Sequence, residues 1–238
     1  SGGTKATARS NWLALLIPNL GNTEIFQMIG GEIASLARMH NFGLVWGGSE
    51  NTQIDPRHNE MEALCKQFIE RNVAGVFFAP YELLESSEQV NQSMALMLRE
   101  AGIPVVLLDR DLTRFPMRSD FDLVCTDNFA GGFMLAEHLI KLGCRKIHYV
   151  ARPLSAPTVD ARIAGVREAL ARHRTEPDPA WVRIGTLDDR KFIRSLTGPI
   201  QPDAYICAND HTAALVMREL QRNQIRVPDD VRVLGFDD

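Results

Sequence analysis

The stretch PDAYICANDHTAALVMRELQRNQIRVPDDVRVLGFDD, residues 202–238, decides the fold class of this chain. A short apolar run, DAYICAND, leads into a segment of helical period, HTAALVMRELQRN, and then into a second short apolar run, VRVLGF. Short apolar runs separated by helices predict parallel strands with crossover helices, because two parallel strands cannot be joined by a tight turn. The predicted fold class is α/β.

The same alternation extends over most of the remaining chain. Six more apolar runs are predicted strands: WLALLIP (12–18), FGLVWGG (42–48), VAGVFFAP (73–80), IPVVLLD (103–109), FDLVCTD (121–127) and KIHYVAR (146–152). Helical spacing follows most of them: Ile29, Ile33, Leu36 and His40; Met61, Leu64, Phe68 and Ile69; Val90, Met94, Met97 and Ala101; residues 129–143; Val159, Ile163, Val166 and Leu170. Repeated units of this kind favour parallel sheets covered by helices on both faces.

Two lobes are predicted, residues 11–125 and residues 126–238. The polar stretch RDLTRFPMRSD, residues 110–120, interrupts the apolar pattern near the middle of the chain. Seven or eight strands with their helices also suit two smaller sheets. The opening SGGTKATARS, residues 1–10, is small and polar and cannot pack a core, so it is interpreted as a linker or a cloning remnant.

Composition excludes several classes of function. A net charge of -4 and a pI near 5.9 lack the clustered Lys and Arg that phosphate neutralisation needs, so the chain alone should bind DNA poorly. No apolar run approaches the ~20 residues of a spanning helix and no signal peptide is evident, so we expect no membrane partner and a cytoplasmic location. The cysteines, Cys65, Cys125, Cys144 and Cys207, form no C-x-x-C pair and are interpreted as reduced core thiols.

Catalytic and metal-binding motifs are missing from the sequence. It has no G-x-S-x-G, no G-x-x-x-x-G-K-[ST], no G-x-G-x-x-G after a strand and no H-E-x-x-H. The six histidines never come closer than ten residues, so no helical face carries a metal-binding pair. We therefore expect no cofactor, no metal and no enzyme, although aspartates at strand ends leave a phosphoryl-transfer or hydrolase site as an alternative.

Polar residues follow several predicted strands, and ligands of open parallel sheets bind beyond the carboxyl ends of strands. Asp109 and Arg110 place an acceptor beside a five-donor fork, which suits a ligand with paired hydroxyls; a surface ion pair is the alternative. Asp127 and Asn209 are also candidates, with helix capping as the alternative. Asp237 is the first residue to emerge from VRVLGF, which we expect to be a buried central strand.

Four stretches carry a family resemblance: AGIPVVLLDR, TDNFAGGFMLAEHLIKLGCRKI, DARIAGVREAL and residues 202–238. Together they resemble the ligand-binding domain of the lactose-repressor (LacI) family of bacterial transcription regulators, over nearly all of residues 8–238. The resemblance implies two Rossmann-like lobes, as in type I periplasmic sugar-binding proteins, with a ligand cleft between them. It also implies a homodimer that binds operator DNA through a separate N-terminal headpiece, absent from this chain, and C-terminal elements beyond Asp238.

The resemblance also assigns ligand-binding residues. The predicted set is Asn22, Asp109, Arg110, Asp127, Arg162, Asn209 and Asp237. Such a set suits a polyol, because each hydroxyl both donates and accepts while Arg supplies only donors and Asp only acceptors. Arg162 lies one residue before a helical stripe position, so a solvated surface site is its alternative. Glu24 stands where many relatives have an aromatic residue, which removes the expected sugar stacking there.

The expected function is effector sensing by a LacI-family transcription regulator. The effector would be a small polar metabolite, sugar-like or nucleobase-like. A periplasmic or transport-linked sugar-binding protein with the same core is the alternative.

Overall fold

The computed structural model describes residues 10–17, 24–47, 57–198 and 201–237, and the chain divides into two compact units. The first unit runs to Thr113 and resumes over Arg118–Cys125. The second unit contains Arg114–Met117 and the chain from Thr126 onward. The short segment Arg114–Met117 thus clusters with the second unit, although the sequence places it within the range 11–125.

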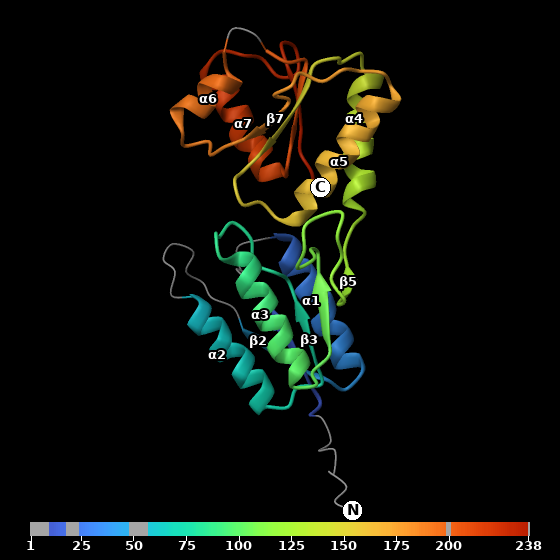
Figure 1. Cartoon of the computed structure of the whole chain (residues 1–238), viewed down its shortest axis with the longest axis vertical. Coiled ribbons are helices and arrows are strands. Elements are labelled where there is room, and N and C mark those ends of the chain that lie inside the picture. Colours follow the sequence, from blue (N-terminus) through green and yellow to red (C-terminus); the bar gives the residue numbers. More distant parts are fainter. Residues whose placement is uncertain (1–9, 18–23, 48–56, 199–200, 238) are drawn as a thin grey trace, which may run out of the picture. The chain divides into compact units, whose positions relative to one another are not determined.

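The first unit contains a parallel sheet with the strand order β2-β1-β3-β4-β5. Its strands are β1 (Trp12–Leu16), β2 (Gly43–Gly47), β3 (Gly75–Phe78), β4 (Val105–Leu108) and β5 (Asp122–Val124). Its helices are α1 (Glu24–Met39), α2 (Arg57–Glu70) and α3 (Ser87–Glu100). Helices cover both faces of this sheet (Figure 1), as parallel strands that are apolar on both sides require.

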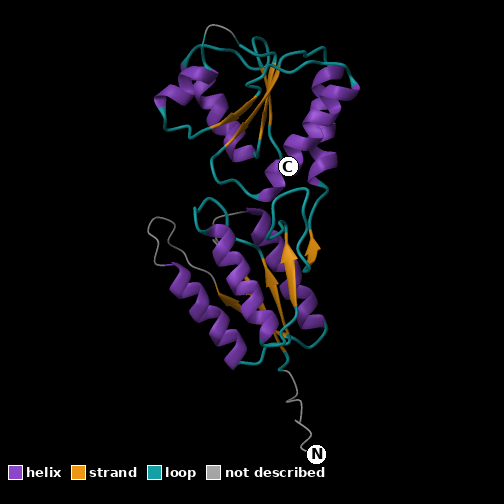
Figure 2. Cartoon of the chain, viewed as in Figure 1, coloured by secondary structure: helices purple, strands orange, loops and turns teal. Residues whose placement is uncertain are grey.

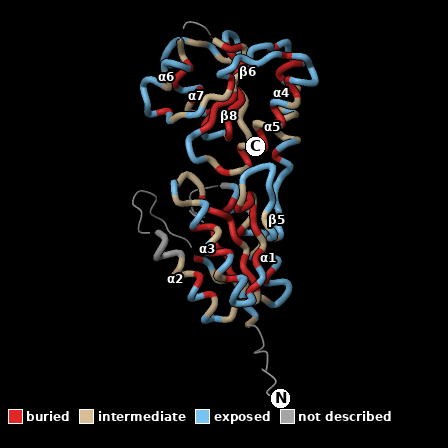
Figure 3. Tube along the Cα trace, viewed as in Figure 1, coloured by how far each residue is buried: buried red, intermediate tan, exposed pale blue. Residues whose placement is uncertain are grey.

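Alternate residues of β1 in the first unit pack against different helices. Leu15 of β1 belongs to a cluster with Phe26 of α1, whereas its neighbour Leu16 belongs to a cluster with Phe68 of α2 and Met94 of α3. This alternation follows from the two-residue period of a strand. Buried residues concentrate on the strands and on the helix faces that meet them (Figure 3).

The second unit contains a parallel sheet with the strand order β7-β6-β8-β9. Its strands are β6 (Ile147–Ala151), β7 (Val182–Ile184), β8 (Ala204–Cys207) and β9 (Arg232–Leu234). Its helices are α4 (Asn128–Lys141), α5 (Pro157–Arg172), α6 (Arg190–Leu196) and α7 (Asp210–Arg222). α4 and α5 pack on one face of the sheet and α6 and α7 on the other (Figure 2).

The α/β class and the parallel sheets are confirmed, and the structure adds elements that the sequence did not predict. β7 is a three-residue strand at a sheet edge and α6 has seven residues, so neither is long enough to show a period. β9 was expected to be a buried central strand. Among the described strands it pairs only with β8, and its residues are half-buried.

Helix α1 packs through only part of the predicted stripe, because Ile29 and Ile33 pack against the cluster that contains Leu15, Ile17 and Phe26. Leu36 is 53% exposed, and the helix ends at Met39, before His40. The buried residues of the helix are Phe26, Gly30 and Ala37, which extend this face at helical spacing. None of the described helices is both long and apolar enough to cross a membrane.

Three of the four cysteines are buried, as expected of core thiols. Burial raises the pKa of Cys65 to about 12, with a contribution from Glu62, and burial with Asp210 raises that of Cys207 to about 12. Both therefore remain thiols at neutral pH. The interpretation as a core thiol is wrong for Cys125, which is exposed because it directly follows the edge strand β5.

Helices α4 and α5 approach each other backbone to backbone, running side by side in Figure 1. A Cβ atom added to Gly132 of α4 would lie 2.1 Å from the carbonyl oxygen of Arg162. A Cβ atom added to Gly165 of α5 would lie 2.0 Å from the carbonyl oxygen of Phe129. These separations leave no room for a side chain, so only glycine allows this crossing.

We predict that Gly165→Ala lowers the free energy of unfolding by about 3 kcal/mol, because the two helix backbones must separate to admit the methyl group. Urea titration followed by far-UV circular dichroism measures the loss. The control is Gly31→Ala in α1, where an added Cβ atom meets nothing within 4 Å and alanine should stabilise the helix by up to about 1 kcal/mol. Equal stability of Gly165→Ala and the parent would contradict the crossing.

Candidate functional site

Asp109 and Arg110 form a tight turn at the carboxyl end of β4. Asp109 has φ 68°, and the Arg110 N–H donates to the carbonyl oxygen of Leu108 at 2.8 Å, which defines a γ-turn centred on Asp109. A non-glycine residue at positive φ is uncommon and strained, and such strain gathers at functional sites. The turn brings the two side chains together, with 2.9 Å between Arg110 Nε and Asp109 Oδ2.

The Arg110 guanidinium is buried between two carboxylates. Its Nη1 lies 2.7 Å from Oε1 of Glu82, a residue of the loop that follows β3, and its carbon lies 5.6 Å from the centre of the Phe26 ring. Burial alone would lower the pKa of Arg110, but the charges and hydrogen bonds of Glu82 and Asp109 raise it on balance. Arg110 therefore remains a cation inside the first unit. Sequence reasoning missed Glu82, although it lies just after the predicted strand end at Pro80 and Tyr81.

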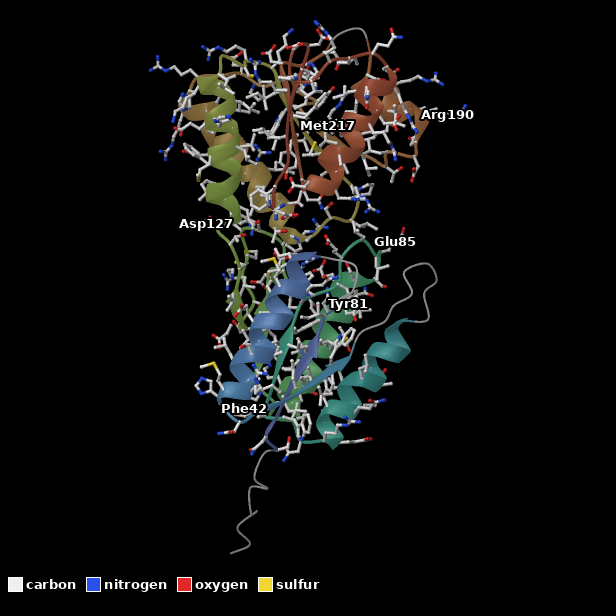
Figure 4. All side chains as sticks on the ribbon, turned by 180° about the vertical axis from the view of Figure 1, so that it is seen from behind. Phe42, Tyr81, Glu85, Asp127, Arg190 and Met217 are labelled. Atoms are coloured by element: carbon white, nitrogen blue, oxygen red, sulfur yellow. The ribbon has the colours of Figure 1, made fainter. Side chains whose placement is uncertain are left out.

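A buried asparagine fixes the loop that carries Glu82. Asn91 of α3 is 4% exposed, accepts the Tyr81 N–H at 2.8 Å and donates to the Tyr81 carbonyl oxygen at 2.8 Å. One side-chain amide thus satisfies both backbone groups of Tyr81, which is labelled in Figure 4. Leu83, on the other side of Glu82, has φ 62°. Glu82 therefore lies between Tyr81, whose backbone is fixed by Asn91, and Leu83, whose backbone has a positive φ.

Arg162 is the centre of a second cluster, in the second unit. It is 6% exposed, which rules out the alternative of a solvated surface residue. Its Nε donates to Oδ1 of Asn128 at 2.8 Å, and its Nη1 donates to the carbonyl oxygen of Ala208. Its guanidinium lies over the Phe236 ring, 3.6 Å from the ring centre. We call Asn128, Arg162, Ala208 and Phe236 the Arg162 cluster.

The Arg162 cluster contains the chain neighbours of three predicted site residues of the second unit. Asn128 directly follows Asp127, Ala208 directly precedes Asn209, and Phe236 directly precedes Asp237. Each of these three contacts of Arg162 is thus made to a chain neighbour of a predicted ligand residue. The ends of β8 and β9 and the starts of α4 and α5 meet at this arginine, as expected at the carboxyl edge of a parallel sheet.

Asp127 and Asn209 both cap helices, which is the alternative that the sequence left open. Asp127 Oδ1 accepts the Ala130 N–H at 2.9 Å at the start of α4 (Figure 4). Asn209 Oδ1 accepts from the Thr212 N–H at 2.9 Å and from the Thr212 hydroxyl at 2.7 Å at the start of α7.

The remaining predicted positions fall at the end of β9 and outside the described residues. Asp237 is exposed and has φ 127°, a conformation that side chains rarely adopt. Asn22 and Asp238 lie outside the residues that the structure describes. Within the described ranges, no group of three or more His, Cys, Asp or Glu could hold a metal ion.

Comparisons with known proteins find relatives in sequence and in structure. The model of the periplasmic binding protein-like domain matches residues 136–238. The HTH-type transcriptional repressor PurR of Mannheimia succiniciproducens is 30% identical over 193 residues, which make up 79% of this chain and 54% of that protein. The solved complex of the transcriptional regulator CelR with cellobiose has a TM-score of 0.78 and 26% identity, covering 97% of this chain and 68% of that chain.

The lac repressor shares the fold. Its dimer, solved with operator and the anti-inducer ONPF, has a TM-score of 0.72 at 23% identity and covers 98% of this chain and 77% of that chain. Residues 136–238 thus match the periplasmic binding protein-like domain, and the chain is similar to LacI-family regulators. The chain spans about half the length of the curated relatives it matches. It covers 53% of one PurR repressor and 54% of another. The curated relatives at this level of similarity include PurR repressors and a ribose operon repressor.

We predict that Arg162→Ala lowers the free energy of unfolding of this chain by about 3 kcal/mol. The reason is the loss of two buried charge-assisted hydrogen bonds and the ring contact. Thermal and urea unfolding measure the loss. Arg167→Ala is the control, because Arg167 is exposed on the same helix and should change stability by no more than ~0.5 kcal/mol. Equal effects of the two substitutions would place Arg162 on the surface after all.

Proposed function

We propose that this chain is the effector-sensing domain of a LacI-family bacterial transcription regulator. It binds a small polar metabolite, sugar-like or nucleobase-like, and thereby controls operator binding by a separate headpiece, acting in the cytoplasm. The Arg162 cluster carries the proposal, because a buried arginine there joins the chain segments on which Asp127, Asn209 and Asp237 lie. A fixed set of donors and acceptors at strand ends is what binding a polyol requires.

The relatives support both parts of this function, the binding of a small effector and the control of operator DNA binding. CelR was solved with cellobiose, a disaccharide, and the lac repressor was solved as a dimer on operator DNA. The net charge of -4 argues that this chain does not supply the DNA-binding face itself. Operator binding would then fall to the headpiece, and the domain described here would supply the response to the effector.

The effector is found by thermal unfolding of the chain over a panel of sugars, sugar phosphates, polyols and nucleobases. A compound at 100 times its dissociation constant should add ~2.7 kcal/mol of stability.

Asp237→Ala should weaken the affinity for a compound found in this panel roughly 10- to 100-fold, because a carboxylate that accepts ligand hydroxyls contributes ~1.5–3 kcal/mol per bond. A panel without any hit would contradict the proposal, and turnover of a hit would point to an enzyme.

Control of operator binding is tested on the full-length regulator. Fluorescence anisotropy of labelled operator DNA should show an affinity that changes at least ~10-fold when the hit is added, a coupling of ~1.4 kcal/mol. An operator affinity that is indifferent to a compound that binds the domain would contradict effector sensing.

A homodimer is part of the proposal. Three apolar side chains of α1 are exposed to solvent, Met28 by 70%, Leu36 by 53% and Met39 by 71%. An exposed apolar helix surface of this kind favours a second copy of the chain as its partner. Light scattering on the full-length regulator should therefore give twice the chain mass at micromolar concentration. Leu36→Lys should shift the distribution to monomer, whereas the control Arg167→Lys should not. A parent that is monomeric would exclude this contact.

A further inference from the structure

Glu82 adds a second carboxylate to the Asp109–Arg110 pair, and so changes the hydrogen-bonding groups of the first unit that a ligand could contact. The Arg110 guanidinium makes ion pairs with Glu82 at 2.7 Å and with Asp109 at 2.9 Å, and its side chain is only 8% exposed. The side chains of Asp109 and Glu82 are 20% and 34% exposed. Solvent therefore meets carboxylates at this strand edge, and the cation lies beneath them.

The charge of this group follows from its members. Two carboxylates pair with one guanidinium here, so acceptor groups outnumber cations. Carboxylate oxygens accept hydrogen bonds and donate none, so they suit hydroxyl and ammonium groups. A ligand carboxylate or phosphate would instead meet like charge in a partly buried setting, where screening is weak.

The backbone holds both carboxylates in place. Asp109 is the centre of the γ-turn after β4, and the residue before Glu82 is clamped by Asn91 through both of its backbone groups. Arg110 in turn fixes the two side chains through ion pairs of hydrogen-bond length. Acceptors that are fixed before binding cost little entropy when a ligand arrives.

We propose that Glu82 is a ligand-facing acceptor that acts with Asp109, and that this pair selects neutral hydroxyl-bearing or amine-bearing effectors over carboxylated or phosphorylated ones. Arg110 is then a positioning residue that orients the two carboxylates, in place of the direct ligand contact that the sequence suggests. The inference rests on the proposed function, because it assigns a ligand class to the strand edge of the effector domain.

The test compares related ligands whose members carry different charges. The probes are glucose, glucosamine, glucuronate and glucose 6-phosphate, the same four forms of galactose, cellobiose with cellobionate, and uracil with orotate. Calorimetric titration of the parent should show the neutral or amino member of the binding series to be favoured at least ~10-fold over its anionic members. This comparison needs no variant, so it stands even if a substitution impairs folding.

Glu82→Gln tests the residue itself. The amide keeps an acceptor for Arg110 but removes the negative charge, so the ratio of neutral to anionic affinity should fall roughly tenfold and binding of the amino member should weaken. Glu85→Gln is the matched control, because Glu85 is an exposed acid of the same loop (Figure 4) and should leave the ratio unchanged. Identical ratios for the two variants would overturn the role of Glu82.

The outcomes separate this inference from the function on which it rests. A series whose anionic member binds best contradicts the ligand class alone, because the chain still senses a metabolite. No binding by any member of the wider panel contradicts the proposed function, and this inference falls with it.

Discussion

The close crossing of α4 and α5 is the constraint on which the second unit depends. Gly132 and Gly165 let the two helix backbones touch, and this contact sets the distance between Asn128 at the start of α4 and Arg162 in α5. A wider crossing would take the asparagine oxygen away from the guanidinium. Gly131 makes room for Phe236 in the same way, since an added Cβ atom would lie 2.6 Å from that ring. The successive glycines Gly131 and Gly132 of α4 thus make room for the Phe236 ring and for the backbone of Arg162.

Each unit contains a buried arginine at its strand ends, but the two are held by different chemistry. Arg110 is held by carboxylates of Glu82 and Asp109, whereas Arg162 is held by an amide oxygen, a backbone carbonyl and an aromatic ring. Carboxylates offset the guanidinium charge, while an amide and a carbonyl orient it without adding charge. The two units can therefore present different electrostatics to a ligand although their sheets are built alike.

The sequence predicted the elements whose signal is local and long, and missed features that depend on tertiary contact. Apolar runs and helical spacing predicted eight strands, because each is a continuous pattern, whereas the three residues of β7 carry no period. The burial of Arg162 depends on Asn128, 34 positions away, and no local pattern reports such a contact. The candidate site shows the same division, because strand ends pointed to Asp109 and Arg110, whereas the ion pair of Glu82 with Arg110 is a tertiary contact that no local pattern reports.

The central claim is that Arg162 is held inside the second unit beside the residues that we propose to bind the effector. Nuclear magnetic resonance of the arginine Nε–H groups tests it most directly, because a buried, hydrogen-bonded Nε–H exchanges slowly with water whereas an exposed one exchanges fast. The account predicts a slowly exchanging Arg162 signal that moves on addition of the effector, with the Arg167 signal fast and unchanged. A fast-exchanging Arg162 signal, or one that the effector leaves in place, would contradict it.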